Sequence, residues 1–343
     1  MALPLIGAPA EVRGAGVIPE ERGLRRDEVR LLISDRHGHQ HARFFELPRF
    51  LERGDVLVVN RSGTLPAALP AHAGETPFQL NLSTHYGRNL WLAEPRWSAA
   101  RPGPIPLTEG ALTKVGGIEA AILGAFPGIP RLRFFEFGGD WQAALSLHGK
   151  PIRYGYLARE APLSAYQTIF ADRPGSAEMP SAARPFTART LDALENRGVE
   201  LVRLTLHTGV SSLESSDFER NRLYPEPFEV EPSAAHSLNA AVARGSRIIA
   251  VGTTMVRALA SVWDGPQFRA ARGLTTLYVQ PGRQLPPLAG LLTGFHEPQA
   301  THLAMLEAVA GRDLLADGYR EARTSGYLWH EFGDVHLLLP AAN

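Results

Sequence analysis

Residues 248–261 read IIAVGTTMVRALAS, and this stretch is the clearest indication of the fold. Its first four residues are a short apolar run, which is typical of a buried strand. Gly252 and two threonines follow, and a helix-like stretch that carries Arg257 begins near Met255. The stretch therefore predicts a buried strand that turns directly into a helix N-terminus.

Helix-like and strand-like stretches alternate before this segment. They read ARTLDALENRG (188–198), VELVRLTLHTG (199–209) and SLNAAVARGSR (237–247). Such alternation predicts an α/β fold in which a largely parallel sheet is covered by helices. The apolar run DVLVVN (55–60) is expected to belong to the same sheet, so the chain between these regions would be an insertion.

The insertion has a different sequence pattern, in which short runs of alternating apolar and polar residues are separated by glycine and proline. Examples are PFQLNLSTHY (77–86), NLWLAEPRW (89–97) and RLRFFEFGG (131–139). Closely spaced strands of this kind indicate a small β-barrel or sandwich. We therefore expect an α/β domain formed by residues 1–65 and 150–343, with an inserted β-barrel domain at 66–149.

Composition limits the possible chemistry. The 343 residues contain no cysteine, which excludes disulfides, thiolate metal sites and cysteine nucleophiles. Lys+Arg and Asp+Glu both total 35, so no global basic field attracts a nucleic acid. No apolar run approaches the ~20 residues of a membrane span. We expect a cytoplasmic protein without a membrane partner; the sequence carries no signal of oligomeric state.

Polar residues follow two of the expected strands. LVRLTLHTGVSSLE (201–214) brings Thr205 and His207 to a loop, where a histidine can act as acid, base or hydrogen-bond donor. The alternative is a histidine that only holds the loop. In the second stretch, Gly252 permits close backbone approach, and Thr253 and Thr254 at a helix N-terminus can bind an anion. A threonine cap with a purely structural role is the alternative there.

A third stretch, LLTGFHEPQATHLAML (291–306), places His296 before a helix that starts near Thr301. His296 and His302 lack a further ligand at a recognisable spacing, so no metal site is predicted. The histidines of HGHQH (37–41) are interpreted as part of a solvated loop rather than as a ligand cluster.

Taken in order, several stretches resemble the S-adenosylmethionine:tRNA ribosyltransferase-isomerase family, and the resemblance covers nearly the whole chain. Several such stretches in the right order are more specific than any one alone. The clearest are RRDEVRLL (25–32), GDVLVVN (54–60), LPAAL (65–69), YQTIFADRPG (166–175), TLHTG (205–209), RIIAVGTTMVRALAS (247–261), LLTGFHEPQATHLAML (291–306) and FGDVHLLL (332–339).

The resemblance implies an α/β domain with an inserted β-barrel. It also implies that the ribosyl part of S-adenosylmethionine, as co-substrate, moves to 7-aminomethyl-7-deazaguanine in tRNA, in queuosine biosynthesis. A base such as His207 or His296 would remove the 5′ proton that the sulfonium makes acidic. The catalytic residues implied are His207, His296 and Glu226, and the substrate-binding residues are Asn60, Thr205, Gly252, Thr253, Thr254, Arg257 and Thr301.

The chain departs from the family pattern at several motif positions. Gly63 and Ala68 stand in place of arginines, Pro185 and Tyr224 in place of histidines, and Gly294 in place of an asparagine. Two alternatives to the tRNA enzyme follow. One is an S-adenosylmethionine-dependent enzyme with a small-molecule acceptor, favoured by the neutral charge and the missing arginines. The other is a non-catalytic binding protein, favoured by proline at the histidine position.

Overall fold

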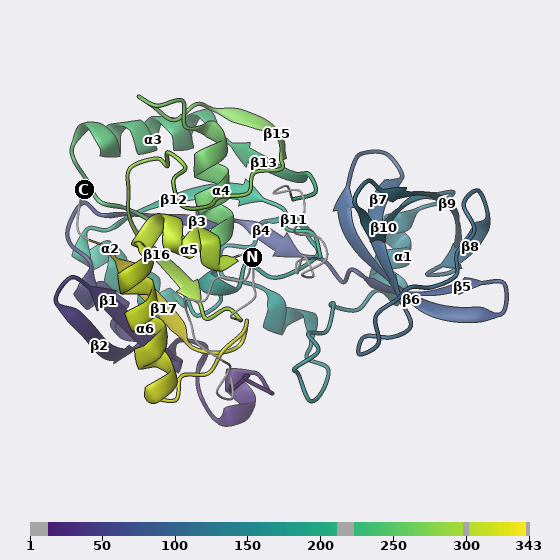
Figure 1. Ribbon diagram of the computed structural model, residues 1–343, viewed down its shortest axis with the longest axis horizontal. Coiled ribbons are helices and arrows are strands. Elements are labelled where there is room, and N and C mark those ends of the chain that lie inside the picture. The colour runs from purple at the N-terminus through teal and green to yellow at the C-terminus, as the bar shows by residue number, and fades with distance from the viewer. Residues whose placement is uncertain (1–12, 211–222, 298–301, 341–343) are drawn as a thin grey trace.

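The structure of the protein is a computed structural model that describes residues 13–210, 223–297 and 302–340 (Figure 1). Within these residues the chain forms a 9-stranded sheet, a closed barrel and a 2-stranded sheet. In spatial order the large sheet consists of β15 (Ala271–Thr275), β13 (Glu226–Val230), β12 (Glu200–Leu206), β3 (Val56–Asn60), β14 (Ile248–Val251), β16 (Leu288–Gly294), β17 (Val335–Leu339), β1 (Arg30–Asp35) and β2 (Gly38–Arg43).

The large sheet is mixed, so the prediction of a largely parallel sheet was wrong. Strands β12, β3, β14 and β16 run parallel to their neighbours in the centre, and β17 is parallel to β1. The pairs at both edges and the β16–β17 pair are antiparallel. At one edge the reason is local: only a tight turn joins β1 to β2, and a turn of this length can pair strands only in antiparallel fashion. The stretch HGHQH, interpreted as a loop, mostly lies in β2.

Helices cover both faces of the large sheet, as the α/β prediction requires (Figure 1). In β3, Val56 and Val58 pack in the core on one face, while Leu57 and Val59 pack on the other. Alternate strand residues point to opposite faces, so a strand covered on both sides is apolar throughout. The helices of this region are α2 (Ala188–Arg197), α3 (Pro232–Ala243), α4 (Thr253–Val262), α5 (His302–Ala310) and α6 (Arg312–Thr324).

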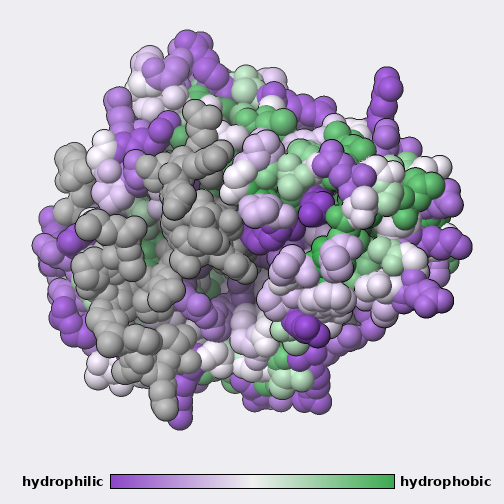
Figure 2. All heavy atoms as spheres, turned by 45° about the vertical axis from the view of Figure 1, so that its right-hand side comes forward, coloured by the Kyte–Doolittle hydropathy of each residue, from purple (hydrophilic) through white to green (hydrophobic). Residues whose placement is uncertain are grey.

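The predicted small barrel is present as a closed antiparallel barrel beside the large sheet (Figure 1). It is followed by α1 (Trp141–His148), whose N-terminus is capped by the side chain of Asp140. On the face shown in Figure 2, hydrophobic residues are interspersed with hydrophilic ones. The barrel strands are β5 (Ala68–Ala73), β6 (Thr76–His85), β7 (Leu90–Arg96), β8 (Leu112–Val115), β9 (Ile118–Phe126) and β10 (Ile129–Phe137).

The core of the barrel extends to the large sheet through two residues beyond its strands. Val210 follows β12 and Tyr224 precedes β13, and both belong to the apolar cluster of the barrel. The backbone N–H of Val210 also donates to Ser83 of β6 at 3.0 Å. These contacts hold the barrel against the ends of the sheet strands. None of the helices in the described part of the chain has the length and apolar character needed to cross a membrane.

Candidate functional site

The motif-bearing stretches converge at one edge of the large sheet. Strands β3, β12, β14 and β16 are parallel, so their carboxyl ends lie together. Asn60 ends β3, His207 follows β12, Gly252 follows β14 and Gly294 ends β16. In open α/β sheets this edge is where ligands bind. The stretches that the sequence analysis singled out therefore lie at the same edge of the sheet.

A cavity of about 90 Å³ lies at this edge. Of the residues predicted from sequence, Gly252, Thr253, Thr254 and His296 line it. His207, Glu226, Asn60, Thr205 and Arg257 are not among the lining residues, although Thr208, next to His207, is. Gly294 and His302, which the sequence analysis named without a binding role, also line it. Lining residues that sequence reasoning missed are Tyr154, Glu178, Met179, Pro180, Ser181, Ala182, Thr208, Val251, Thr293 and Glu331.

The N-terminus of α4 forms one wall of the cavity. Gly252, at its N-cap, has φ 89° and ψ 156°, a conformation that is essentially restricted to glycine. No described side chain caps this helix, so the first backbone N–H groups of α4 are open to a ligand. A helix N-terminus in this state favours a carboxylate or a phosphate.

His296 forms another wall. Its ring stacks on that of His302 with centroids 4.5 Å apart, and its Nε2 lies 3.1 Å from the Thr293 hydroxyl. Burial, with smaller contributions from His302 and His330, holds the pKa of His296 well below its usual range. Burial also lowers the pKa of His302 to about 4, and Arg257 adds to this effect. Both imidazoles are therefore neutral at pH 7.

His207 belongs to a hydrogen-bonded chain of hydroxyl groups. Its Nδ1 lies 2.7 Å from Ser62 Oγ, which lies 2.6 Å from Ser176 Oγ. Ser176 Oγ accepts a hydrogen bond from the backbone N–H of Thr208 at 3.0 Å. If the Ser176 hydroxyl donates to Ser62 and the Ser62 hydroxyl donates to Nδ1, both hydroxyl hydrogens have an acceptor. The reverse direction leaves the Ser176 hydrogen without an acceptor among the described residues, so we assign the first direction. The proton of the imidazole then resides on Nε2. Burial, assisted by Arg272, lowers the pKa of His207 to about 4.

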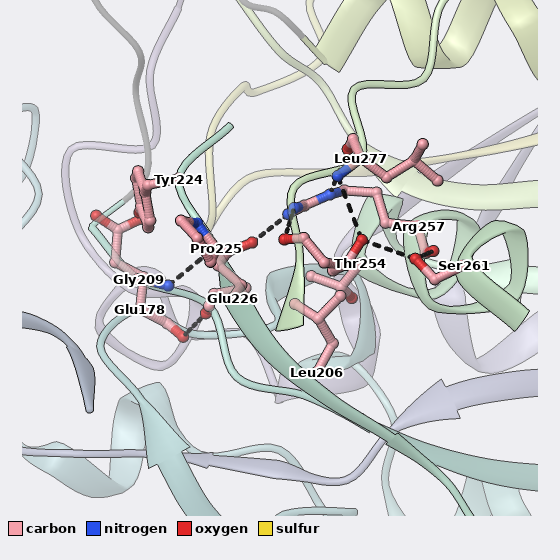
Figure 3. A network of polar contacts seen from close by, with 12 residues as sticks. Glu178, Leu206, Gly209, Tyr224, Pro225, Glu226, Thr254, Arg257, Ser261 and Leu277 are labelled. Carbon is pink, nitrogen blue, oxygen red and sulfur yellow. Dashed lines mark hydrogen bonds and ion pairs between the residues drawn. The ribbon is translucent and has the colours of Figure 1, made fainter. Parts of the chain in front are cut away.

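Glu226 and Arg257 form a buried ion pair beside the cavity. Figure 3 shows Arg257 of α4 and Glu226 of β13 pointing toward one another. Glu226 also accepts a hydrogen bond from the backbone N–H of Gly209 at 2.7 Å, and Arg257 donates to the carbonyl of Leu277 at 3.0 Å. The pair thus joins the segment after β12 to the segment after β15.

The amide of Asn60 bonds mostly to backbone groups, with one longer bond of 3.4 Å from its nitrogen to the Thr254 hydroxyl. It donates to the carbonyl of Leu206 at 2.9 Å, and its oxygen accepts from the N–H groups of Ser62 and Leu206. It thereby fastens β3 to β12 at the edge that carries the cavity. Thr205 is buried within β12 opposite Glu229. Thr301 lies outside the described residues.

The positions that depart from the family pattern occupy different environments. Gly63 lies in β4 (Ser62–Thr64), which pairs with β11 (Arg173–Ser176), and Ala68 begins the barrel. The hydroxyl of buried Tyr224 donates to the carbonyl of Val210. Pro185 and Gly294 line a second, small cavity of about 10 Å³, which His330 also lines. His330, from a distant segment, therefore lines the same cavity as Pro185.

Comparison with known proteins identifies the family. A family model described as "Queuosine biosynthesis protein" matches residues 15–338. A relative from Moorella thermoacetica, named S-adenosylmethionine:tRNA ribosyltransferase-isomerase, is 34% identical and covers 94% of this chain and 96% of its own. A relative of the same name from Thermus thermophilus is 34% identical, with 96% of each chain covered.

A solved structure agrees with these relatives. The crystal structure of S-adenosylmethionine tRNA ribosyltransferase from Thermotoga maritima is 25% identical, with a TM-score of 0.53. The match covers 96% of this chain and 98% of that one. On the family match and the identity of these relatives, the chain belongs to the queuosine biosynthesis protein family.

Proposed function

We propose that this chain is an S-adenosylmethionine:tRNA ribosyltransferase-isomerase. It would transfer the ribosyl part of S-adenosylmethionine to 7-aminomethyl-7-deazaguanine in tRNA, isomerise it, and release adenine and methionine. The observation that carries the proposal is the match to the family over residues 15–338, with relatives that bear this name. The cavity at the carboxyl edge of the sheet supports the proposal, because ligands of open α/β sheets commonly bind at this edge.

The cavity would hold only part of the S-adenosylmethionine molecule. The open N-terminus of α4, with Thr253 and Thr254, suits the methionine carboxylate or a ribose hydroxyl. Arg257 and Glu226 would act indirectly, because each already holds the other. Asn60 and Thr205 would act through the position of the strand ends, and Thr301 stays in the proposed binding set on resemblance alone.

His296 is the better placed of the two candidate bases. It lines the cavity and is neutral at pH 7 because burial lowers its pKa. With the serine hydroxyls directed as above, His207 would present a protonated Nε2 and serve as a hydrogen-bond donor. This assignment gives the two histidines different roles in one reaction.

We also propose two domains, an α/β domain at 1–65 and 150–343 and an inserted barrel domain at 66–149. The barrel strands, from Ala68 to Phe137, support these limits. A tRNA substrate would place the enzyme in the cytoplasm. No metal takes part in the proposed reaction.

One observation favours a second candidate, an S-adenosylmethionine-dependent enzyme with a small-molecule acceptor. Among the described residues that line the cavity there is no lysine or arginine. A polyanionic acceptor would more commonly meet basic side chains there. The charge of the whole chain is also zero.

Chromatographic detection of released adenine and methionine separates these functions. The purified chain is incubated with S-adenosylmethionine and either tRNA that carries 7-aminomethyl-7-deazaguanine or the same tRNA with guanine at that position. Release with only the first tRNA supports the proposal. Release that does not require tRNA favours the second candidate. Binding without release under any condition indicates a non-catalytic relative. His296→Ala is expected to abolish release while leaving the fold intact.

A further inference from the structure

The charges around the 90 Å³ cavity are of one sign. Two acidic residues, Glu178 and Glu331, line it, and no lysine or arginine does so among the described residues. The two lining histidines are neutral at pH 7, because burial lowers the pKa of each. The side chains around the cavity therefore carry negative charge without a matching positive one, and a carboxylate that is withdrawn from water without a counter-charge is costly.

Tyr156 fixes Glu331 through two hydrogen bonds. The Tyr156 hydroxyl donates to the carboxylate of Glu331 and accepts from its backbone N–H at 3.2 Å. These two bonds fix both the main chain and the side chain of Glu331. No ion pair between Glu331 and a basic residue is found within the described part of the chain. The carboxylate is thus positioned but not neutralised.

A stack of rings supports this arrangement. The ring of Tyr156 lies between that of Tyr154, with centroids 5.7 Å apart, and that of His330, with centroids 4.4 Å apart. His330, directly before Glu331, has a φ of 73°, which is uncommon for a residue other than glycine. The stack restricts the rotation of Tyr156 and therefore the position of the Glu331 carboxylate.

We infer that Glu331 supplies the counter-charge for a cationic centre of the ligand in this cavity, and that Tyr154, Tyr156 and His330 position it. The inference rests on the proposed function, which names S-adenosylmethionine as the ligand. That molecule carries two cationic centres, the sulfonium and the α-ammonium group. The N-terminus of α4 lines the same cavity and favours the negative end of the amino acid.

Calorimetric titration with three ligands tests the inference and tells the two centres apart. S-adenosylmethionine carries both charges, S-adenosylhomocysteine lacks the sulfonium, and 5′-methylthioadenosine lacks both. In Glu331→Gln, binding of S-adenosylmethionine should weaken by roughly 10-fold or more, as loss of a charge-assisted contact implies. Unchanged binding of S-adenosylhomocysteine assigns the carboxylate to the sulfonium. Equal weakening of both amino-acid ligands, with 5′-methylthioadenosine unchanged, assigns it to the ammonium group.

Matched variants separate charge from packing. Glu331→Asp keeps the charge and should restore part of the affinity. Tyr156→Phe should weaken the same ligands as Glu331→Gln, but less, because it removes only the group that positions the carboxylate. Glu160→Gln is the control, since Glu160 is 64% exposed and pairs with Lys150 at the surface.

Two results would overturn the inference. One is an unchanged affinity for all three ligands in Glu331→Gln. The other is an equal loss for all three, including the uncharged one. In either case, binding of S-adenosylmethionine by the wild-type chain leaves the proposed function standing. A wild-type chain that binds none of the three would overturn the proposed function and the inference with it.

Discussion

The chemical role of His207 depends on neighbours that are distant in the sequence. From sequence, this histidine was open to the roles of acid, base, donor or loop holder. Ser62 and Ser176 reduce the choice, because their hydroxyl groups form a chain that begins at a backbone N–H and ends at Nδ1. Neither serine stood out in the sequence as a partner of a histidine.

The tautomer of His207 can be measured directly. Correlation spectra of ¹⁵N-labelled protein at pH 7 should show the proton on Nε2 and an unprotonated Nδ1. The ring should stay neutral as the pH falls toward about 4, where its lowered pKa allows protonation. Ser62→Ala removes the donor to Nδ1 and should produce a mixture of tautomers. A proton on Nδ1 in the wild-type chain would contradict the direction assigned to the hydroxyl chain.

At the scale of elements, the Glu226–Arg257 pair joins α4 to β13. Arg257→Met should lower the free energy of unfolding by roughly 3–5 kcal/mol, because it leaves a buried carboxylate without its partner. The double variant Glu226→Leu, Arg257→Met should be markedly more stable than Arg257→Met. Urea denaturation measures the free energy of unfolding of both variants. If Arg257 instead binds the substrate carboxylate, Arg257→Met would impair binding of S-adenosylmethionine with little loss of stability.

The turn from β14 into α4 depends on Gly252. A Cβ at this position would lie 3.4 Å from the Cβ of Ala182, and its φ of 89° strains any other residue. Gly252→Ala should destabilise the protein by about 1–3 kcal/mol and weaken S-adenosylmethionine binding, because the N-terminus of α4 must shift.

Gly245→Ala is the matched control for this turn. Gly245 also has a positive φ, 69°, but an added Cβ meets nothing within 4 Å. This variant should lose ~1–2 kcal/mol of stability and keep its affinity for S-adenosylmethionine. Equal effects of the two variants on affinity would show that the turn at Gly252 has no special role in binding.

Elements with strong apolar patterns were predictable, and those without were not. The run that became β14 and the helix after it were found from residues 248–261 because both are buried on their apolar faces. Strand β2 was missed because GHQHAR has no apolar alternation and is largely exposed. Strand direction was also mistaken, since the period of a strand is the same in parallel and antiparallel pairs.

The whole molecule builds its cavity from segments that are far apart in the chain. The sequence identified the walls formed by Gly252, Thr253, Thr254 and His296, because each follows a strand of the central sheet. It gave no sign of Tyr154, Glu178 or Glu331, which lie outside regular strands and helices and come together only through the fold. Residues of this kind have no periodicity by which a sequence pattern could locate them.

Stability of the whole molecule should depend on a histidine remote from the cavity. His336 of β17 is fully buried, and its Nε2 lies 2.8 Å from Ser34 Oγ. Its Nδ1 has no hydrogen-bond partner among the described residues, so a proton added there would find no acceptor. Burial, with a smaller contribution from His39, lowers the pKa of His336 to about 3.

The sign of the resulting pH dependence follows from linkage. The unfolded chain protonates His336 near its ordinary pKa of about 6.5, whereas the folded chain does not until about pH 3. Stability is therefore complete above pH 6.5 and is lost as the pH falls. Between pH 7 and 5, the protonation of His336 in the unfolded chain should lower the free energy of unfolding by about 2 kcal/mol. Glutamine does not titrate, so in His336→Gln the free energy of unfolding, measured by urea denaturation, should fall between pH 7 and 5 by about this amount less than in the wild type. His148→Gln, at an exposed position, is the control. An equal fall in His336→Gln and wild type would mean that His336 is protonated in the folded chain as readily as in the unfolded one.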